Sequence, residues 1–224
     1  NIEKLERLQR KLNKEFKKKT KVFYMDVSSE ESIINVVKSL NNSKTKIQVL
    51  INNASFNHTP SLRKNENDLE NFTLKKWNEE IQVGLTGVFL CTKHFGQMMK
   101  KNNYGSIINI SSDLSIISPD QRIYNNKYFY KPITYSAIKT GIIGLTRYTS
   151  TYWSKYNIRC NALSPGGIYN KQNKSFVKKL IKLIPLSRMA NKNEYKSAIQ
   201  FMASNESSYM TGHNLVIDGG RTVW

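Results

Sequence analysis

The chain has 224 residues, of which 35 are Lys or Arg and 16 are Asp or Glu, for a formal net charge of +19. This length suits one large domain with a single core. No apolar run approaches the ~20 residues that span a bilayer, no secretory signal is recognisable, and two cysteines cannot build a disulfide framework, so we expect a globular cytoplasmic protein without membrane spans.

The positive charge is a weak argument for nucleic-acid binding. Basic residues are spread along the chain, and the one dense run, FKKKTK at 16–21, does not alternate with aromatic residues as a base-stacking surface would. We therefore predict a solvated, Lys-rich surface and no nucleic-acid partner. The three histidines have no ligand spacing, so we predict no metal site.

Helical and β-rich segments alternate along the first half of the chain. Residues 1–16 place apolar side chains on one stripe, which predicts a helix. The run KVFYMDV at 21–27 predicts a short strand, and a capping box from Ser28 to Glu31 predicts the start of the next helix. The apolar run IQVLINNA at 47–54 indicates a buried strand.

The second half continues the same alternation. A long helical pattern runs from Leu74 to Met99, and an irregular loop ends at Pro132 before the helix that contains ITYSAIKTGIIGL. Further segments are predicted as strands at 105–111, 158–164 and 213–218 and as a helix at 194–202.

Short buried strands that alternate with longer helices predict an α/β fold. We expect one domain over residues 1–224, with a doubly wound, mostly parallel Rossmann-type sheet and helices on both faces. Such sheets bind ligands at the carboxyl ends of their strands, so that edge is where we look for a site.

Tyr135 and Lys139 are four residues apart on a predicted helix and therefore share a face. A free phenol has a pKa of ~10, and a nearby ammonium favours the phenolate, which predicts a lowered pKa and an acid–base pair. The alternative is an ordinary surface turn of an amphipathic helix.

Several sequence blocks, taken in order, make the chain resemble the short-chain dehydrogenase/reductase family over nearly its whole length. They are DV at 26–27, NNA at 52–54, GSIINISS at 105–112, YSAIK at 135–139, SPGG at 164–167 and YMTGHNLVIDGG at 209–220. The resemblance implies an NAD- or NADP-dependent oxidoreductase that interconverts an alcohol and a ketone by hydride transfer, as a homodimer or homotetramer. It also implies that Ser112, Tyr135 and Lys139 are catalytic, and that Tyr135 and Lys139 also contact the cofactor.

Further cofactor contacts are implied position by position. Asp26 and Val27 match the pair that lines the adenine pocket, and Asn52 and Ala54 match a block beside the cofactor. The turn that receives the nicotinamide amide is matched by Pro165, Gly166 and Ile168, with Asn170 where the family often has Thr. The alternatives are structural, because Asn52 can satisfy buried backbone groups and Pro165–Gly166 can be a simple turn.

Besides Asn170, and Ser55 in a usual glycine position, the chain departs from the family pattern in three places. It has no GxxxGxG-like string and lacks the family's first strand, glycine-rich turn and second strand, so we expect it to be part of a longer chain; the rival is a relative without cofactor. Gly84 stands where the family usually has an Asn of the proton relay. A glycine inside a helix costs roughly 1 kcal/mol relative to Ala, which suggests a local reason such as close packing.

The third departure is an insertion of about ten residues between Ser112 and Tyr135, and loops of that size are commonly functional. It carries three basic and four aromatic side chains, Arg122, Lys127, Lys131, Tyr124, Tyr128, Phe129 and Tyr130. With neighbouring blocks it resembles the branch associated with bacterial surface-sugar and flagellin modification, which implies a sugar substrate that is acidic or phosphorylated. A solvated loop is the alternative for the insertion, and a non-catalytic ligand- or partner-binding relative is the alternative for the function.

Overall fold

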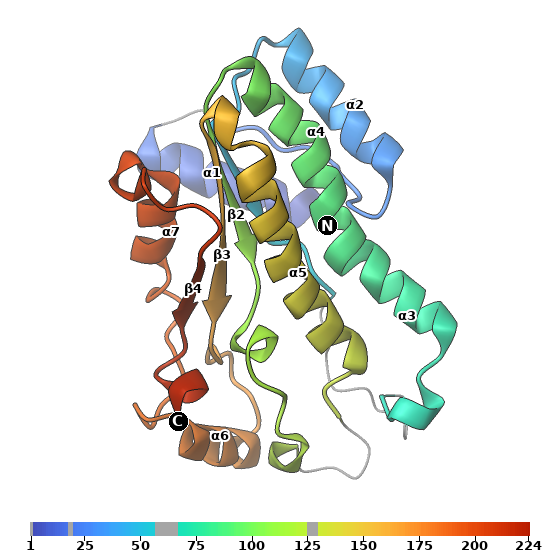
Figure 1. Ribbon diagram of the computed structural model, residues 1–224, viewed down its shortest axis with the longest axis vertical. Helices are drawn as coiled ribbons and strands as arrows, with labels where there is room; N and C mark the ends of the chain where they lie inside the picture. Colours follow the sequence, from blue (N-terminus) through green and yellow to red (C-terminus); the bar gives the residue numbers. More distant parts are fainter. Residues whose placement is uncertain (1, 18–19, 57–66, 125–129) are drawn as a thin grey trace.

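Four parallel strands form the centre of the protein in a computed structural model that describes residues 2–17, 20–56, 67–124 and 130–224 (Figure 1). They are β1 (Val49–Asn52), β2 (Gly105–Ile110), β3 (Ile158–Pro165) and β4 (Asn214–Ile217), and they lie in the order β1-β2-β3-β4. All three pairings are parallel, for example Ile108 opposite Asn161. The predicted parallel α/β sheet is confirmed.

Helices cover both faces of this sheet. They are α1 (Ile2–Phe16), α2 (Glu30–Asn42), α3 (Leu74–Ile81), α4 (Gly87–Lys101), α5 (Ile133–Tyr152), α6 (Lys174–Leu180) and α7 (Lys196–Ala203). Successive strand residues point to opposite faces, so Ile107 of β2 packs with Met99 of α4 and Ile108 packs with Met202 of α7. In Figure 1, α4 and α5 cross in front of the strands. None of the helices in the described ranges is long and apolar enough to span a membrane.

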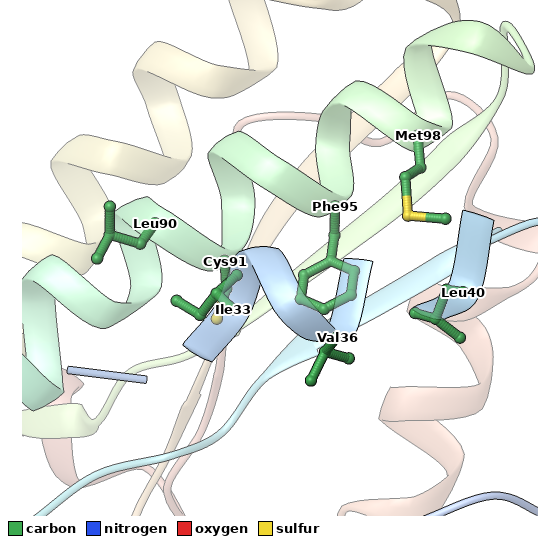
Figure 2. Packing of buried hydrophobic residues seen from close by; sticks show 7 residues of the cluster. All are labelled: Ile33, Val36, Leu40, Leu90, Cys91, Phe95 and Met98. Carbon is green, nitrogen blue, oxygen red and sulfur yellow. The ribbon is translucent and has the colours of Figure 1, made fainter. Parts of the chain in front are cut away.

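The α2–α4 contact forms one of the apolar clusters of the core. Figure 2 shows Ile33, Val36 and Leu40 of α2 next to the side chains of α4, among them Cys91 and Phe95. Ile33 is completely buried. By contrast α1 buries none of its residues, although its predicted helix is confirmed.

The predicted strand at 21–27 is wrong, since none of these residues joins the sheet. Phe23, Met25 and Val27 instead pack against the α2–α4 cluster. The alternating pattern therefore reflects one apolar side of an extended segment, and no described strand lies beside it to complete a ladder.

The predicted capping box is also wrong. The residue that caps α2 is Ser29, whose side chain accepts a hydrogen bond from the backbone N–H of Ser32. Ser28 is engaged elsewhere, because both its backbone N–H and its hydroxyl donate to Asp26 Oδ1, at 2.9 and 2.7 Å.

The predicted long helix at 74–99 is helical throughout but contains one irregular turn. A π-helical turn at Gln82–Thr86 joins α3 to α4 and includes Gly84. A Cβ atom on Gly84 would lie 2.8 Å from Ile138 Cδ1 of α5. The expected local reason for glycine is thus close packing against α5.

Candidate active site

Ser112, Tyr135 and Lys139 lie together at the carboxyl end of β2. Ser112 follows this strand and caps the short 3-10 turn Asp113–Ser115, while Tyr135 and Lys139 occupy the first turns of α5. Pro132 precedes the helix, which suits its fixed φ, and α5 packs along β3. The Ser112 and Tyr135 hydroxyls share a hydrogen bond. The sequence motifs therefore converge in space as expected.

Lys139 is fixed by hydrogen bonds at its side-chain ammonium and at its backbone carbonyl. Its Nζ donates to the carbonyl oxygen of Ile110 at 3.0 Å, and its own carbonyl accepts from Ser111 Oγ at 2.8 Å. Burial disfavours the ammonium and lowers the pKa of Lys139 to about 8. The ammonium lies 5.7 Å from the centre of the Tyr135 ring.

The expected lowering of the Tyr135 pKa is wrong, since this pKa is raised. Burial of the phenol raises its pKa, the hydrogen bond with Ser112 opposes this in part, and the charge of Asp113 adds to the rise. The Lys139 ammonium is directed at a backbone carbonyl, so its effect does not overcome desolvation.

A second ammonium covers the face of the same ring. Lys131 Nζ lies 3.6 Å from the centre of the Tyr135 ring, which is a cation–π contact. The backbone of Lys131 exchanges two hydrogen bonds with the Gln121 side chain, at 2.9 and 3.1 Å. Burial and the charge of Lys139 lower the pKa of Lys131 to about 8.

A buried ion pair adjoins Ser112. Arg221 Nη1 lies 2.8 Å from Asp113 Oδ2, and the two side chains are only 7% and 5% exposed. The other carboxylate oxygen, Oδ1, accepts from Ser112 Oγ at 2.8 Å. Sequence reasoning missed this pair because 108 residues separate its members. The only local signal was a charged residue directly after the predicted catalytic serine.

Three of the predicted cofactor-binding residues line one small cavity. Val27, Asn52 and Ala54 border a space of about 90 Å³ beside α4. Asn52 also has a structural role, since its amide donates to Asn109 Oδ1 at 2.8 Å and to Thr92 Oγ1 at 3.1 Å. Asp26 does not line this cavity; it is exposed and its pKa is lowered by hydrogen bonds from Ser28.

The predicted nicotinamide-side turn follows β3. Pro165 ends the strand opposite Ile217, and the Gly166 N–H donates to the Ile217 carbonyl at 2.9 Å. A Cβ on Gly166 would lie 2.7 Å from Asp218 Cα, so only glycine fits. Ile168 forms a bridge with Ala190, whereas Asn170 is exposed and its backbone N–H donates to Gln172.

The inserted loop is described only in part, and Lys127, Tyr128 and Phe129 lie outside the described residues. Arg122 is 89% exposed and pairs with Asp120. The Tyr124 ring packs on Phe176 of α6 with centroids 5.4 Å apart, so this aromatic supports the domain rather than a ligand.

A larger cavity of about 450 Å³ opens beside the insertion and the start of α5. Polar side chains from two loops and the helix line it, namely Asn67, Asp68, Glu70, Gln121, Lys131 and Ser136. Within the described residues, no three His, Cys, Asp or Glu side chains gather as a metal site would need.

Known proteins match this chain over most of its length. The family model described as "Enoyl-(Acyl carrier protein) reductase" matches residues 1–222. An NAD-dependent glycerol dehydrogenase of Listeria innocua is 30% identical over 92% of this chain and 76% of its own. The post-translational flagellin modification protein A of Campylobacter coli is 28% identical over 95% of this chain and 82% of its own.

A solved structure agrees in both sequence and fold. The short-chain dehydrogenase of Leptospira borgpetersenii with bound NAD+ is 34% identical and superposes with a TM-score of 0.79, covering 88% of this chain and 73% of its own. Three observations agree: the family model matches residues 1–222, the sheet is parallel, and Ser112, Tyr135 and Lys139 lie together. This chain therefore belongs to the short-chain dehydrogenase/reductase family of nicotinamide-dependent oxidoreductases.

Proposed function

We propose that the protein interconverts an alcohol and a ketone with NAD or NADP, with Ser112, Tyr135 and Lys139 as its catalytic residues. The observation that carries this proposal is the meeting of these three side chains at the carboxyl end of β2. A parallel sheet places ligands at this edge. The glycerol dehydrogenase relative and the NAD+-bound structural relative support the reaction class.

The residues present fit a nicotinamide cofactor along the strand ends. Gly166 lets the turn after β3 pack closely on the Asp218 backbone, and Val27, Asn52 and Ala54 border a small cavity at the end of β1. Lys139 supplies a buried cation between these two positions along the sheet. When bound, the cofactor accepts or supplies the hydride.

Tyr135 moves the proton in this proposal. In reduction, its hydroxyl gives a proton to the carbonyl oxygen as hydride reaches the carbon, so that a new C–H and a new O–H bond form together. In oxidation, the phenolate takes the alcohol proton as hydride leaves. Burial raises the pKa of Tyr135 above its ordinary value, so the protonated phenol is the form that predominates near neutral pH.

For the substrate we propose a hydroxyl-rich, sugar-like molecule with an anionic group. The cavity beside α5 is lined by the carboxylate of Asp68 and the amides of Asn67 and Gln121. Carboxylates accept hydrogen bonds from hydroxyls, and amides both donate and accept them. Lys131 is the cation on its wall, next to Tyr135. The flagellin-modification relative supports a role in surface-glycan synthesis.

We also propose a cytoplasmic homodimer or homotetramer. The outward sides of α4 and α5 expose large rings, with Phe89 48%, Tyr148 66% and Tyr152 61% accessible, which suits a helix-to-helix subunit contact.

The test substitutes Tyr135 in the full-length protein. Tyr135→Phe should reduce kcat by about 10²–10⁴-fold, because it removes the proposed general acid–base group and such groups contribute roughly this much. Cofactor affinity, measured by nicotinamide fluorescence, should change little. Tyr209→Phe, at a fully exposed tyrosine outside the site and outside the proposed subunit contact, is the matched control and should keep full turnover. Turnover retained in Tyr135→Phe refutes the assignment, and failure to bind either cofactor would favour a ligand-binding relative instead.

A further inference from the structure

A buried ion pair links the C-terminal segment to the residue after Ser112. Arg221, in the 3-10 turn Arg221–Val223, reaches Asp113 at 2.8 Å, and both residues are more than nine-tenths buried. Taking two charges out of water is unfavourable unless their geometry and remaining hydrogen bonds compensate. An isolated structural pair at this place would be a poor source of stability, which directs attention to the group that it touches.

The turn that carries Arg221 is itself fixed. Asp218 Oδ1 accepts from the Gly220 N–H at 2.9 Å, and Asp218 Oδ2 accepts from the Thr222 N–H at 2.7 Å. Gly220 has φ +89°, a left-handed conformation that suits glycine. These hydrogen bonds fix the turn that places the Arg221 guanidinium beside Asp113. The buried Nε of Arg221 has no hydrogen-bond partner.

Asp113 uses its two oxygens differently. Oδ2 faces Arg221, while Oδ1 accepts both the Ser112 hydroxyl at 2.8 Å and the Leu114 N–H at 2.9 Å. With its proton directed at Asp113 and one lone pair accepting the Leu114 N–H at 3.2 Å, the Ser112 oxygen has one lone pair left for Tyr135, with which it shares a hydrogen bond. A chain of contacts thus runs from Arg221 through Asp113 and Ser112 to Tyr135.

We propose that Asp113, held by Arg221, is a positioning residue that accepts the Ser112 hydroxyl proton in a hydrogen bond and thereby orients the Ser112 oxygen toward Tyr135. The proposal rests on the proposed function, to which it adds the residues that orient the catalytic serine. The Asp113 carboxylate raises the pKa of Tyr135, in agreement with this geometry.

Other charged or titratable groups lie around the chain of contacts. They are Lys131 and Lys139 beside Tyr135, and Tyr124, Tyr195 and Asp120 near Asp113 or Arg221. Both lysines favour the phenolate, so they oppose the effect of Asp113. Substitution of Asp113 or Arg221 isolates the contribution of the pair because the lysines remain.

The two members of the pair should shift the pH profile in opposite directions. Oxidation of the alcohol requires the phenolate, so kcat/KM rises with pH through the Tyr135 pKa. Asp113→Asn removes an anion and should move this limb to lower pH by about one unit, which is about a tenfold gain at a fixed pH on the limb. Arg221→Met leaves the carboxylate uncompensated and should move the limb to higher pH, while Arg221→Lys should stay near wild type.

A matched charge removal tests for unspecific effects. Glu30 and Lys93 form an exposed pair between α2 and α4, 2.8 Å apart, and lie outside the site. Glu30→Gln and Lys93→Met should leave the limb unmoved. If Arg221→Met does not fold, the double variant Asp113→Asn/Arg221→Met removes both charges and should show the limb of Asp113→Asn.

A crystal structure of each folded variant separates this proposal from the oxidoreductase function. We expect the Ser112 hydroxyl to leave its contact with residue 113 in Arg221→Met and to keep it in Arg221→Lys. An unmoved Ser112 together with unmoved pH limbs in all variants overturns the proposal. If Ser112 is displaced in Arg221→Met but the wild-type protein turns over no alcohol or ketone, the positioning role is supported and the proposed function is refuted.

Discussion

Gly84→Ala tests why the long helix is interrupted between α3 and α4. The new methyl group would lie 2.8 Å from Ile138 Cδ1 and 3.0 Å from Ile138 Cγ2, both closer than carbon atoms pack. Inserting a methyl group into a packed core costs about 1–3 kcal/mol. Alanine regains about 1 kcal/mol of helix propensity, so we expect a net loss of about 0–2 kcal/mol in the free energy of unfolding, and no gain.

A second glycine gives the opposite expectation from the same substitution. Gly144 lies in α5, and a Cβ there would meet no atom within 4 Å. Gly144→Ala should therefore raise the free energy of unfolding by about 0.5–1 kcal/mol. Ile138→Val removes the atom nearest to the new methyl, so Gly84→Ala/Ile138→Val should be less destabilised than the sum of its single variants.

The free energy of unfolding of the wild type and of all four variants is measured by chemical denaturation at one protein concentration, followed by tryptophan fluorescence and circular dichroism. A Gly84→Ala protein that gains as much stability as Gly144→Ala would refute the packing argument. The reason for this glycine would then have to be sought in the π-helical turn itself.

Three further predictions concern buried groups. Lys131→Met should raise Tm at pH 7, because burial lowers the Lys131 pKa to about 8 and charging this residue in the fold is therefore unfavourable. The gain should shrink as pH rises from about 8 and should vanish above the ordinary lysine value of ~10.4. Cys91 and Cys160, whose thiol pKa values burial raises to about 11 and 12, should react with a thiol reagent at pH 8 only after unfolding; rapid labelling of the native protein would contradict this. Asn109→Leu should lower the free energy of unfolding by about 1–3 kcal/mol, because it removes one of the two acceptors of the buried Asn52 amide. An unchanged denaturation midpoint would contradict this.

The sheet was predictable because its strands are marked by their own residues. Runs such as GSIINIS bury both faces of the strand, and this leaves a continuous apolar segment that periodicity detects. The run KVFYMDV misled because alternation records which side of a segment is buried. It does not record whether a neighbouring backbone is present to form a ladder, and Phe23 and Met25 are buried by helices.

The candidate site was predictable to the extent that its members are close in sequence or belong to family blocks. Tyr135 and Lys139 share a helix face, and Ser112 ends a strand. Asp113 and Arg221 could not be paired from the sequence, since nothing local relates a residue after β2 to one after β4. Only the fold brings the ends of these strands to one edge.

The direction in which the Tyr135 pKa shifts could not be predicted from the four-residue spacing of Tyr135 and Lys139. An ammonium beside a phenol attracts the phenolate and so favours a lower pKa of the phenol. Burial of an ionisable group can shift its pKa by up to about 3–5 units in the other direction. Helix spacing correctly placed an ammonium near the phenol, 5.7 Å from the ring centre, but the outcome is decided by how much water the fold removes from Tyr135. The same competition explains why both lysines at this ring have lowered pKa values, and why a single nearby carboxylate, Asp113, can favour the protonated phenol.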